Sequence, residues 1–294
     1  MVKESVKNVE TCKKIRESLK YFCFLHNDSY SGTITKMALF STPAIVLGGI
    51  RLGEADKLVT FFTHARGKLK GVAKGARRMK SRFGATLEPF THCTLVVFDK
   101  GTEKLARIEQ CDIIHSFQSL REDWGGIERS SRMVDLVAQM TPDGQANHEI
   151  FDLLLQGLSF LEAKKDPPLS VLLFMSRLIA CSGYQPHWDA CLKCRLPFKS
   201  GKVEALYFSP GAGGALCSKC GQTLVPLIPM SQGTRAFLSA SQKMGYERAH
   251  RLRPSLQIQK ECEAIFKHTL SHITGKSTRR FTKNPGPKLR TARL

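Results

Sequence analysis

The hydrophobic positions of this chain follow two different periods. From Ala44 to about Ser116, short runs rich in β-branched and aromatic residues alternate with glycine, proline or charged turns, which is typical of β-strands. The runs are AIVLGGI, KLVTFFT, GKLKGVAKGA, HCTLVVF and KLARIEQCDII. Five short strands in about 75 residues predict a small barrel, and five is the number of strands in an OB-fold.

After Phe117 the apolar residues recur at helical spacing. Ile127, Val134 and Val137 lie on one helix face, and the turn that begins at Pro142 ends that element. Side chains suited to N-caps precede three further apolar stripes, at Asn147, Ser231 and Ser255. The second half of the chain is therefore predicted to be mainly helical.

These patterns predict a multidomain α+β protein with an N-terminal OB-fold β-barrel, an α-helical domain and a zinc module built on four cysteines. We expect the following segments: an OB-fold at 37–117, a helical domain at 118–186 and 225–274, a zinc-binding module at 187–224, and a basic disordered tail at 275–294. Residues 1–36 have no clean period. Translation from Met37 is one interpretation of them, and an ordered extension is the other.

The most basic segment is RGKLKGVAKGARRMKSR, residues 66–82, which has eight cations and no carboxylate. The cations are Arg66, Lys68, Lys70, Lys74, Arg77, Arg78, Lys80 and Arg82. On a strand, the three lysines of its first half share one face. Each nucleic-acid phosphate that Lys or Arg neutralises releases a counterion, so this basic block predicts a nucleic-acid surface. A solvated, solubilising surface is the alternative.

The net charge of the chain is concentrated in few places. Of the formal +20, the basic block contributes +8, and the segment from Thr274 to Leu294 contributes +7 without an acidic residue. Such asymmetry favours a polyanionic partner. No run of about 18 uncharged apolar residues and no secretory signal is present, so we expect a cytoplasmic protein with no membrane partner.

Four of the ten cysteines have the spacing of metal ligands: C-x2-C, twenty-two residues, C-x2-C. They are Cys191, Cys194, Cys217 and Cys220. Two such pairs satisfy tetrahedral Zn²⁺, and four sulfur ligands leave no open position for a catalytic water, so a structural zinc is expected, one per chain. Iron and disulfides are the alternatives, and a reducing compartment disfavours disulfides. His187 is a further candidate ligand.

The sequence gives no positive case for catalysis. It has no nucleophile motif, no His-x-Glu beside the cysteines and no clustered carboxylates for Mg²⁺. Two other functions stay open. One is a DNA-processing enzyme with a structural zinc. The other is an RNA-binding or translation-associated zinc-ribbon protein, for which Phe83 is a candidate exposed aromatic residue for base stacking.

Several blocks together resemble the family of the DNA repair protein RecO. They are GEADKLVTFFT, VAKGARR, KSRFGATLEPF, NHEIFDLLLQGL, and CSGYQPHWDACLKC with FSPGAGGALC. The resemblance covers about residues 38–280. Gly49 and Ile50 depart from it, because the family is often basic there.

The resemblance implies a non-enzymatic recombination mediator in DNA repair, associated with the nucleoid. Members of the family bind single- and double-stranded DNA and anneal complementary strands. With RecR they help RecA load on DNA coated with single-strand-binding protein (SSB), and they contact the SSB C-terminal tail. It also implies that the four cysteines bind zinc and that the basic block forms the DNA surface of the OB-fold.

Overall fold

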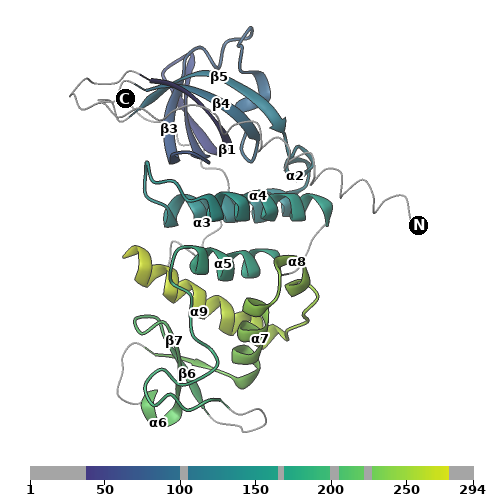
Figure 1. Cartoon of the computed structure of the whole chain (residues 1–294). Helices are drawn as coiled ribbons and strands as arrows, with labels where there is room; N and C mark the ends of the chain where they lie inside the picture. The colour runs from purple at the N-terminus through teal and green to yellow at the C-terminus, as the bar shows by residue number, and fades with distance from the viewer. Residues whose placement is uncertain (1–37, 100–104, 165–168, 199–204, 222–226, 278–294) are drawn as a thin grey trace, which may run out of the picture. The chain divides into compact units, whose positions relative to one another are not determined.

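The structure is a computed structural model that describes residues 38–99, 105–164, 169–198, 205–221 and 227–277. Its first part is a closed barrel with the strand order β1-β2-β3-β5-β4 (Figure 1). The strands are β1 (Ala38–Leu52), β2 (Asp56–Thr63), β3 (Gly67–Ala73), β4 (His92–Asp99) and β5 (Ala106–His115). β3 and β5 pair in parallel and close the barrel, whereas the other neighbours are antiparallel. The expected OB-fold is thereby confirmed.

The barrel strands are apolar on both faces because each face is buried against a different core. Ala44, Val46 and Phe61 point into the barrel and form its interior cluster. Their sequence neighbours Ile45 and Phe62 point outward and belong to the core of the helical region. Successive side chains of a strand alternate between its two faces. Continuous apolar runs such as AIVL and FF are therefore expected in strands that are buried on both faces.

The helical region begins with α2 (Ser119–Glu122), α3 (Trp124–Met140), α4 (His148–Ala163) and α5 (Ser170–Cys181). The predicted cap at Asn147 is confirmed, because its Oδ1 accepts a hydrogen bond of 3.0 Å from the N–H of Ile150. Asp123 caps α3 in the same way, through the N–H of Gly126. Each such cap stabilises its helix by about 1 kcal/mol.

The remaining described residues include a small sheet with one short helix and three further helices. The sheet has the order β7-β6-β8, from β6 (Leu206–Ser209), β7 (Gly214–Cys217) and β8 (Ile228–Met230), with α6 (Ser218–Gly221) after β7. The helices are α7 (Gln232–Lys243), α8 (Tyr246–Ala249) and α9 (Leu256–Thr274). The predicted caps Ser231 and Ser255 accept hydrogen bonds from Thr234 and Ile258, and Gly275 ends α9 in the left-handed conformation.

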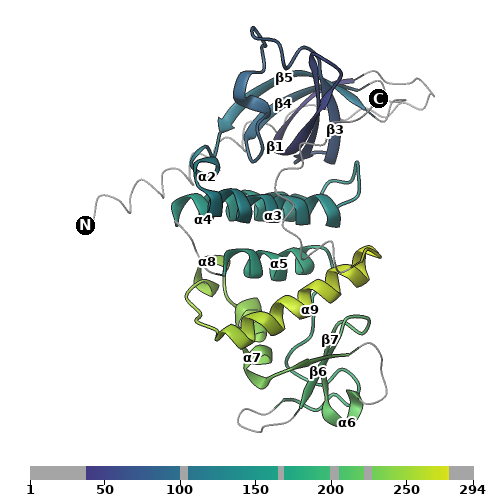
Figure 2. The same cartoon turned by 180° about the vertical axis from the view of Figure 1, so that it is seen from behind.

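The barrel packs on the helical region through α3 and α4, which both views place beside it (Figure 2). Phe62 of β2 stacks on Phe151 of α4, with ring centroids 6.3 Å apart. The imidazoles of His64 and His148 stack beside this pair at 4.1 Å. Gly67 has a positive φ of 63°, and a Cβ there would lie 1.8 Å from the carbonyl oxygen of Gln145. Only glycine permits this close approach.

Two segments predicted from the sequence lie outside the described residues. They are residues 1–36 and the basic tail beyond Ser277. Among the helices that the structure describes, none combines the length and the apolar character that a membrane span requires.

Candidate nucleic-acid interface and metal centre

The basic block extends over β3 and the loop that follows it, up to η2 (Gly84–Leu87). The strand alternates as predicted: Gly67, Gly71 and Ala73 are buried, while Lys70 is exposed. After the strand, the N–H of Gly75 donates to Asp56 Oδ1 at 2.8 Å and so fixes the start of the loop. The structure therefore divides the block into a strand part, Arg66 to Lys70, and a loop part, Lys74 to Arg82.

In the strand part, Arg66 is held by the barrel itself. Its Nη1 lies 2.9 Å from Asp99 Oδ2, and its guanidinium lies over the ring of Phe40, 3.9 Å from the centroid. A guanidinium over an aromatic face is attracted by the ring quadrupole. Arg66 therefore has two partners within the protein before any ligand binds.

Lys68 is directed into the helical region rather than toward solvent. Its Nζ donates to the carbonyl oxygens of Ala138 at 2.8 Å and Thr141 at 2.6 Å, and it pairs with Asp143 Oδ1 at 3.1 Å. Only 14% of its side chain is exposed. The carbonyls at a helix C-terminus lack intrahelical partners and carry partial negative charge. Lys68 therefore caps the end of α3 from the barrel.

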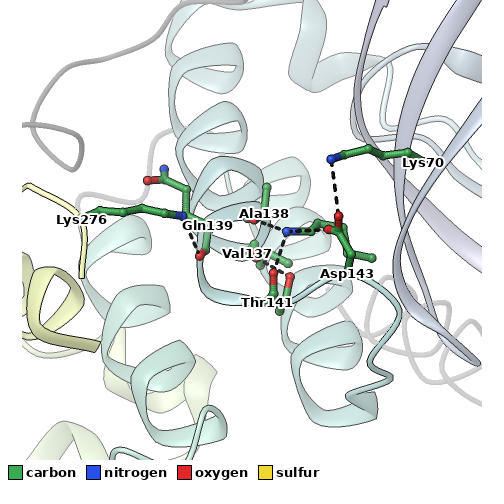
Figure 3. A network of polar contacts seen from close by, with 8 residues as sticks. Lys70, Val137, Ala138, Gln139, Thr141, Asp143 and Lys276 are labelled. Carbon is green, nitrogen blue, oxygen red and sulfur yellow. Dashed lines mark hydrogen bonds and ion pairs between the residues drawn. The ribbon is translucent and has the colours of Figure 1, made fainter. Parts of the chain in front are cut away.

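Lys70 and Asp143 complete this contact. Lys70 Nζ lies 3.5 Å from Asp143 Oδ2, so the carboxylate has a lysine on each oxygen (Figure 3). Partial burial alone would raise the pKa of Asp143, but Lys68 and Lys70 outweigh it and hold that pKa below its usual range. On the far side of the helix end, Lys276 donates to the carbonyl of Gln139. The first half of the basic block thus joins the barrel to α3.

Two arginines in the loop part also bind the barrel. Arg77 Nη1 donates to the carbonyls of Gly53 at 3.2 Å and Glu54 at 2.8 Å, and its own N–H donates to Ala55 at 2.9 Å. Arg82 lies 3.6 Å from Glu109 Oε2, with more than half of its side chain exposed. Arg77 holds the loop against the β1–β2 turn, while Arg82 stays open to solvent.

Lys74, Arg78 and Lys80 differ from the other five cations. All three are exposed, and their side chains have no hydrogen-bond or ion-pair partner among the residues that the structure describes. They are the groups of the block best able to pair with an external anion. The assignment of the eight cations to DNA is a prediction.

One expectation for this surface is wrong. Phe83, a candidate for base stacking, is 1% exposed and belongs to the barrel interior. The guanidinium of Arg82 lies over its ring, 5.0 Å from the centroid. Phe83 anchors the end of the loop in the core, because burying an aromatic ring there is more favourable than leaving it in water.

The four predicted metal ligands converge on one point. The Sγ atoms of Cys191, Cys194, Cys217 and Cys220 all lie within 4.8 Å of one another. The first pair comes from the loop before β6, and the second from the end of β7 and α6. The left-handed conformation of Arg195, with φ of 60°, turns the chain after the first pair. His187, the further candidate ligand, is not part of the cluster.

The cluster fits a tetrahedral metal ion. Four sulfurs about 2.3 Å from a central zinc lie roughly 3.8 Å from one another, and Cys194 Sγ and Cys217 Sγ are 3.9 Å apart. Burial favours the neutral thiol of Cys191, but the N–H groups of Cys194, Cys217 and Lys193 donate to its sulfur and lower its pKa to about 6. A thiolate is the form that binds metal. The four cysteines can therefore hold a metal ion.

The metal centre is joined to α7 by polar contacts and aromatic packing. Asp189 accepts a hydrogen bond from Ser239 at 2.7 Å and pairs with Lys243 at 2.9 Å. Trp188 stacks on Phe208 with centroids 5.2 Å apart. The cluster thus fixes a loop that packs on the helical region.

Two family descriptions match the chain over most of its length. Residues 37–117 match "Recombination protein O N terminal", and residues 129–280 match "Recombination protein O C terminal". The chain belongs to the recombination protein O family. The first match begins at Met37.

Curated relatives agree with this membership. The chain is 32% identical to the DNA repair protein RecO of Anaeromyxobacter dehalogenans, over 83% of this chain and 96% of that protein. It is 33% identical to the DNA repair protein RecO of Thermodesulfovibrio yellowstonii, over 80% and 94%. The protein of Myxococcus xanthus with the same name is 36% identical over 68% and 82%. A general role in DNA repair and recombination follows from the family.

Sequence reasoning missed the partners of Lys68 and Lys70 in the basic block. Asp143 and the carbonyls of α3 lie about 70 positions after Lys68 in the sequence, so no local pattern connects them. The one local signal is the turn at Pro142-Asp143-Gly144, which by itself indicates only the end of a helix. His64 and His148 at the same junction were missed for the same reason.

Proposed function

We propose that this protein is a non-enzymatic recombination mediator that binds single- and double-stranded DNA and anneals complementary strands. The observation that carries the proposal is the group of three exposed cations, Lys74, Arg78 and Lys80, on the barrel of a RecO-family chain, which have no side-chain partner among the described residues. Contacts to phosphate fix a strand without reading its sequence. A surface of this kind suits a protein that must act at any damaged locus.

We propose different roles within the basic block. Lys74, Arg78, Lys80 and Arg82 contact phosphates, and Arg77 shapes the loop that carries them. Arg66, Lys68 and Lys70 act mainly inside the protein, through Asp99, the end of α3 and Asp143. This division assigns the DNA contacts to about half of the eight cations.

The proposed partners follow the family. With RecR, the protein would help RecA load on DNA coated with SSB, and it would bind the acidic C-terminal tail of SSB, at the nucleoid in the cytoplasm. The helical region is the proposed platform for these proteins, and residues 275–294 are a second cationic segment for DNA. The segment boundaries 37–117, 118–186 with 225–274, and 187–224 stand as the proposed domains.

We propose zinc as the metal of the four cysteines, with a structural role. Zinc bound by four sulfurs has a closed coordination sphere and contributes folding energy directly. Elemental analysis of the purified protein should find one zinc per chain, and Cys194→Ser should lose it and destabilise the packing of the loop on α7. A folded, active protein that contains no zinc would refute this assignment.

The mediator proposal is tested by annealing. Two complementary strands coated with SSB should anneal in the presence of the protein and the absence of ATP. Annealing should be slower when the SSB lacks its acidic tail, and the variant with Lys74, Arg78 and Lys80 all changed to Ala should fail while still binding the tail peptide. If the protein anneals bare strands but never coated ones, with or without RecR, it is a general DNA-binding protein and the mediator proposal is wrong.

A further inference from the structure

The tip of the basic loop carries one large apolar side chain between two cations. Met79 is fully exposed, with a relative accessibility of 104%. Arg78 and Lys80 on either side of it are exposed as well. A thioether in water makes none of the packing contacts that it makes in a core, so this side chain contributes nothing to the described fold.

The loop is anchored so that Met79 stays outside. On the N-terminal side, Arg77 binds the carbonyls of the β1–β2 turn. The N–H of Arg78 donates to Gly75, and the N–H of Ser81 donates to Arg78, which makes the tip compact. On the C-terminal side, Phe83 is buried in the barrel. With both ends fixed, the tip presents Met79 to solvent as a preformed feature.

We propose that Met79 contacts the bases of a single-stranded nucleic acid whose phosphates pair with Arg78 and Lys80. The inference rests on the proposed DNA-binding function and adds the preference for strand form. Bases of a single strand are open to apolar contact, whereas those of a duplex are stacked and paired. Proteins insert Met, among other apolar residues, between stacked bases, and non-specific single-strand binders combine side chains that stack on the bases with cations along the backbone.

Methionine suits contact with any base. Its unbranched, polarisable side chain adapts to irregular surfaces, so one Met can contact purines and pyrimidines alike. The arrangement is therefore compatible with binding that does not depend on sequence. The long side chain also leaves the base edge available, which annealing requires.

The test compares three ligands of equal backbone length: a single strand of about 16 nucleotides, the upper end of the site size of an OB-fold, its duplex, and an abasic single strand. Met79→Ala should weaken binding to the single strand by about 3- to 10-fold, because it removes the apolar area buried against a base. Affinity for the duplex and the abasic strand should not change, nor should the salt dependence of single-strand binding. Leu256→Ala, which removes an exposed side chain of α9, is the control and should affect none of the ligands.

A second variant gives a spectroscopic measurement. In Met79→Trp, the fluorescence of the introduced indole should be quenched when the single strand is added, and it should not be quenched when the abasic strand is added. Equal binding of Met79→Ala and the unchanged protein to the single strand would overturn the inference, as would an equal loss on all three ligands. If the unchanged protein binds none of the three, the proposed function itself fails. A further outcome is that the triple variant of Lys74, Arg78 and Lys80 binds the single strand more weakly while Met79→Ala binds it as the unchanged protein does. That result would refute the Met79 contact and leave the proposed DNA-binding function standing.

Discussion

The strand part and the loop part of the basic block have the same kind of side chains in opposite environments. Lys68 is mostly buried and binds two carbonyls and a carboxylate, whereas Lys80, twelve positions later, is exposed without a partner among the described residues. Lys68 and Lys70 of the strand part face the C-terminus of α3, which offers acceptors and negative charge. The loop part faces solvent. Under the proposed function, a run of positive charge is free to bind an external anion only where the fold supplies no acceptors of its own.

The physical cause lies in helix termini. The last carbonyls of α3 need donors, and a lysine from a neighbouring strand supplies them while its stem packs on apolar surface. Asp143, in the turn after the helix, adds a carboxylate that two lysines share. The block therefore combines a structural function and a proposed binding function in seventeen consecutive residues.

The largest effect is expected from the loop part. Changing Lys74, Arg78 and Lys80 together to Ala should make the dependence of log affinity on log salt shallower by about 2, since each single-strand phosphate contact contributes about 0.7. At about 0.1 M salt this amounts to roughly 100-fold weaker binding. Fluorescence anisotropy over a salt series measures both quantities.

The control for this variant removes the same charge elsewhere. Lys164, Arg248 and Lys260 are exposed cations of the helical region. Changing these three to Ala lowers the net charge equally, and the salt slope should stay as in the unchanged protein. Equal slopes for the two triple variants would show that general charge, and not the loop, attracts DNA.

The second effect compares Lys68 of the strand part, which should affect stability, with Lys80 of the loop part, which should affect DNA binding. Lys68→Met keeps the apolar stem but leaves the acceptors at the end of α3 without their donor, which should cost about 1–3 kcal/mol of the free energy of unfolding. Urea unfolding measures the loss, and the salt slope of DNA binding should not change. Lys80→Met should do the reverse and flatten the slope without affecting unfolding. If Lys68→Met flattens the slope, Lys68 belongs to the DNA surface after all.

The third effect is a loss of stability at acidic pH, caused by a histidine where the barrel packs on α4. Burial, helped by the neighbouring His115, lowers the pKa of His92 to about 4, and the His92 ring lies edge-on to Phe151. A depressed pKa in the folded state gives stability that is present above about pH 6.5 and is lost as the pH falls toward 4. The free energy of unfolding should fall by about 2 kcal/mol by pH 5.

His92→Phe is the matched variant for this prediction, because it keeps a ring at the junction without a titrating group. Its unfolding should depend less steeply on pH between about 6.5 and 4. His64 contributes in the same direction, since burial and His148 lower its pKa. If the free energy of unfolding of His92→Phe depends on pH as in the unchanged protein, His92 is not the group that makes the fold sensitive to acid.

The smallest effect is expected from the two outer residues of the strand part. Arg66 and Lys70 are already paired with Asp99 and Asp143 across partly exposed surfaces. Such pairs contribute about 0–1 kcal/mol, so changing both residues to Ala should alter stability little. The salt slope should change by less than about 0.7, the contribution of one phosphate. A larger change would mean that DNA displaces these carboxylates.

Local patterns in the sequence predicted the elements well. The caps Asn147, Ser231 and Ser255 were found because a cap and its donor are a few residues apart. The four cysteines were found because each C-x2-C pair carries two ligands on one turn, which is the spacing of a metal site. The strands of the barrel were found from their apolar runs, although the runs do not reveal that one face of them is covered by helices.

Contacts between distant segments were not predictable in the same way. The partners of Lys68 and the burial of Phe83 depend on how the barrel and α3 pack, and nothing near either residue encodes that packing. The basic run before Phe83 favours an exposed ring. In the structure, the chain turns inward at that position and its ring fills the barrel.

The outward-facing apolar residues of the barrel have a consequence for protein engineering. Ile45, Phe62 and Phe90 pack into the core of the helical region. A fragment that ends after β5, made as a minimal DNA-binding reagent, would expose these side chains to water as one apolar patch. Such a reagent would associate with itself unless the patch were redesigned, for instance by replacing Phe62 with a polar residue suited to a strand, such as Thr.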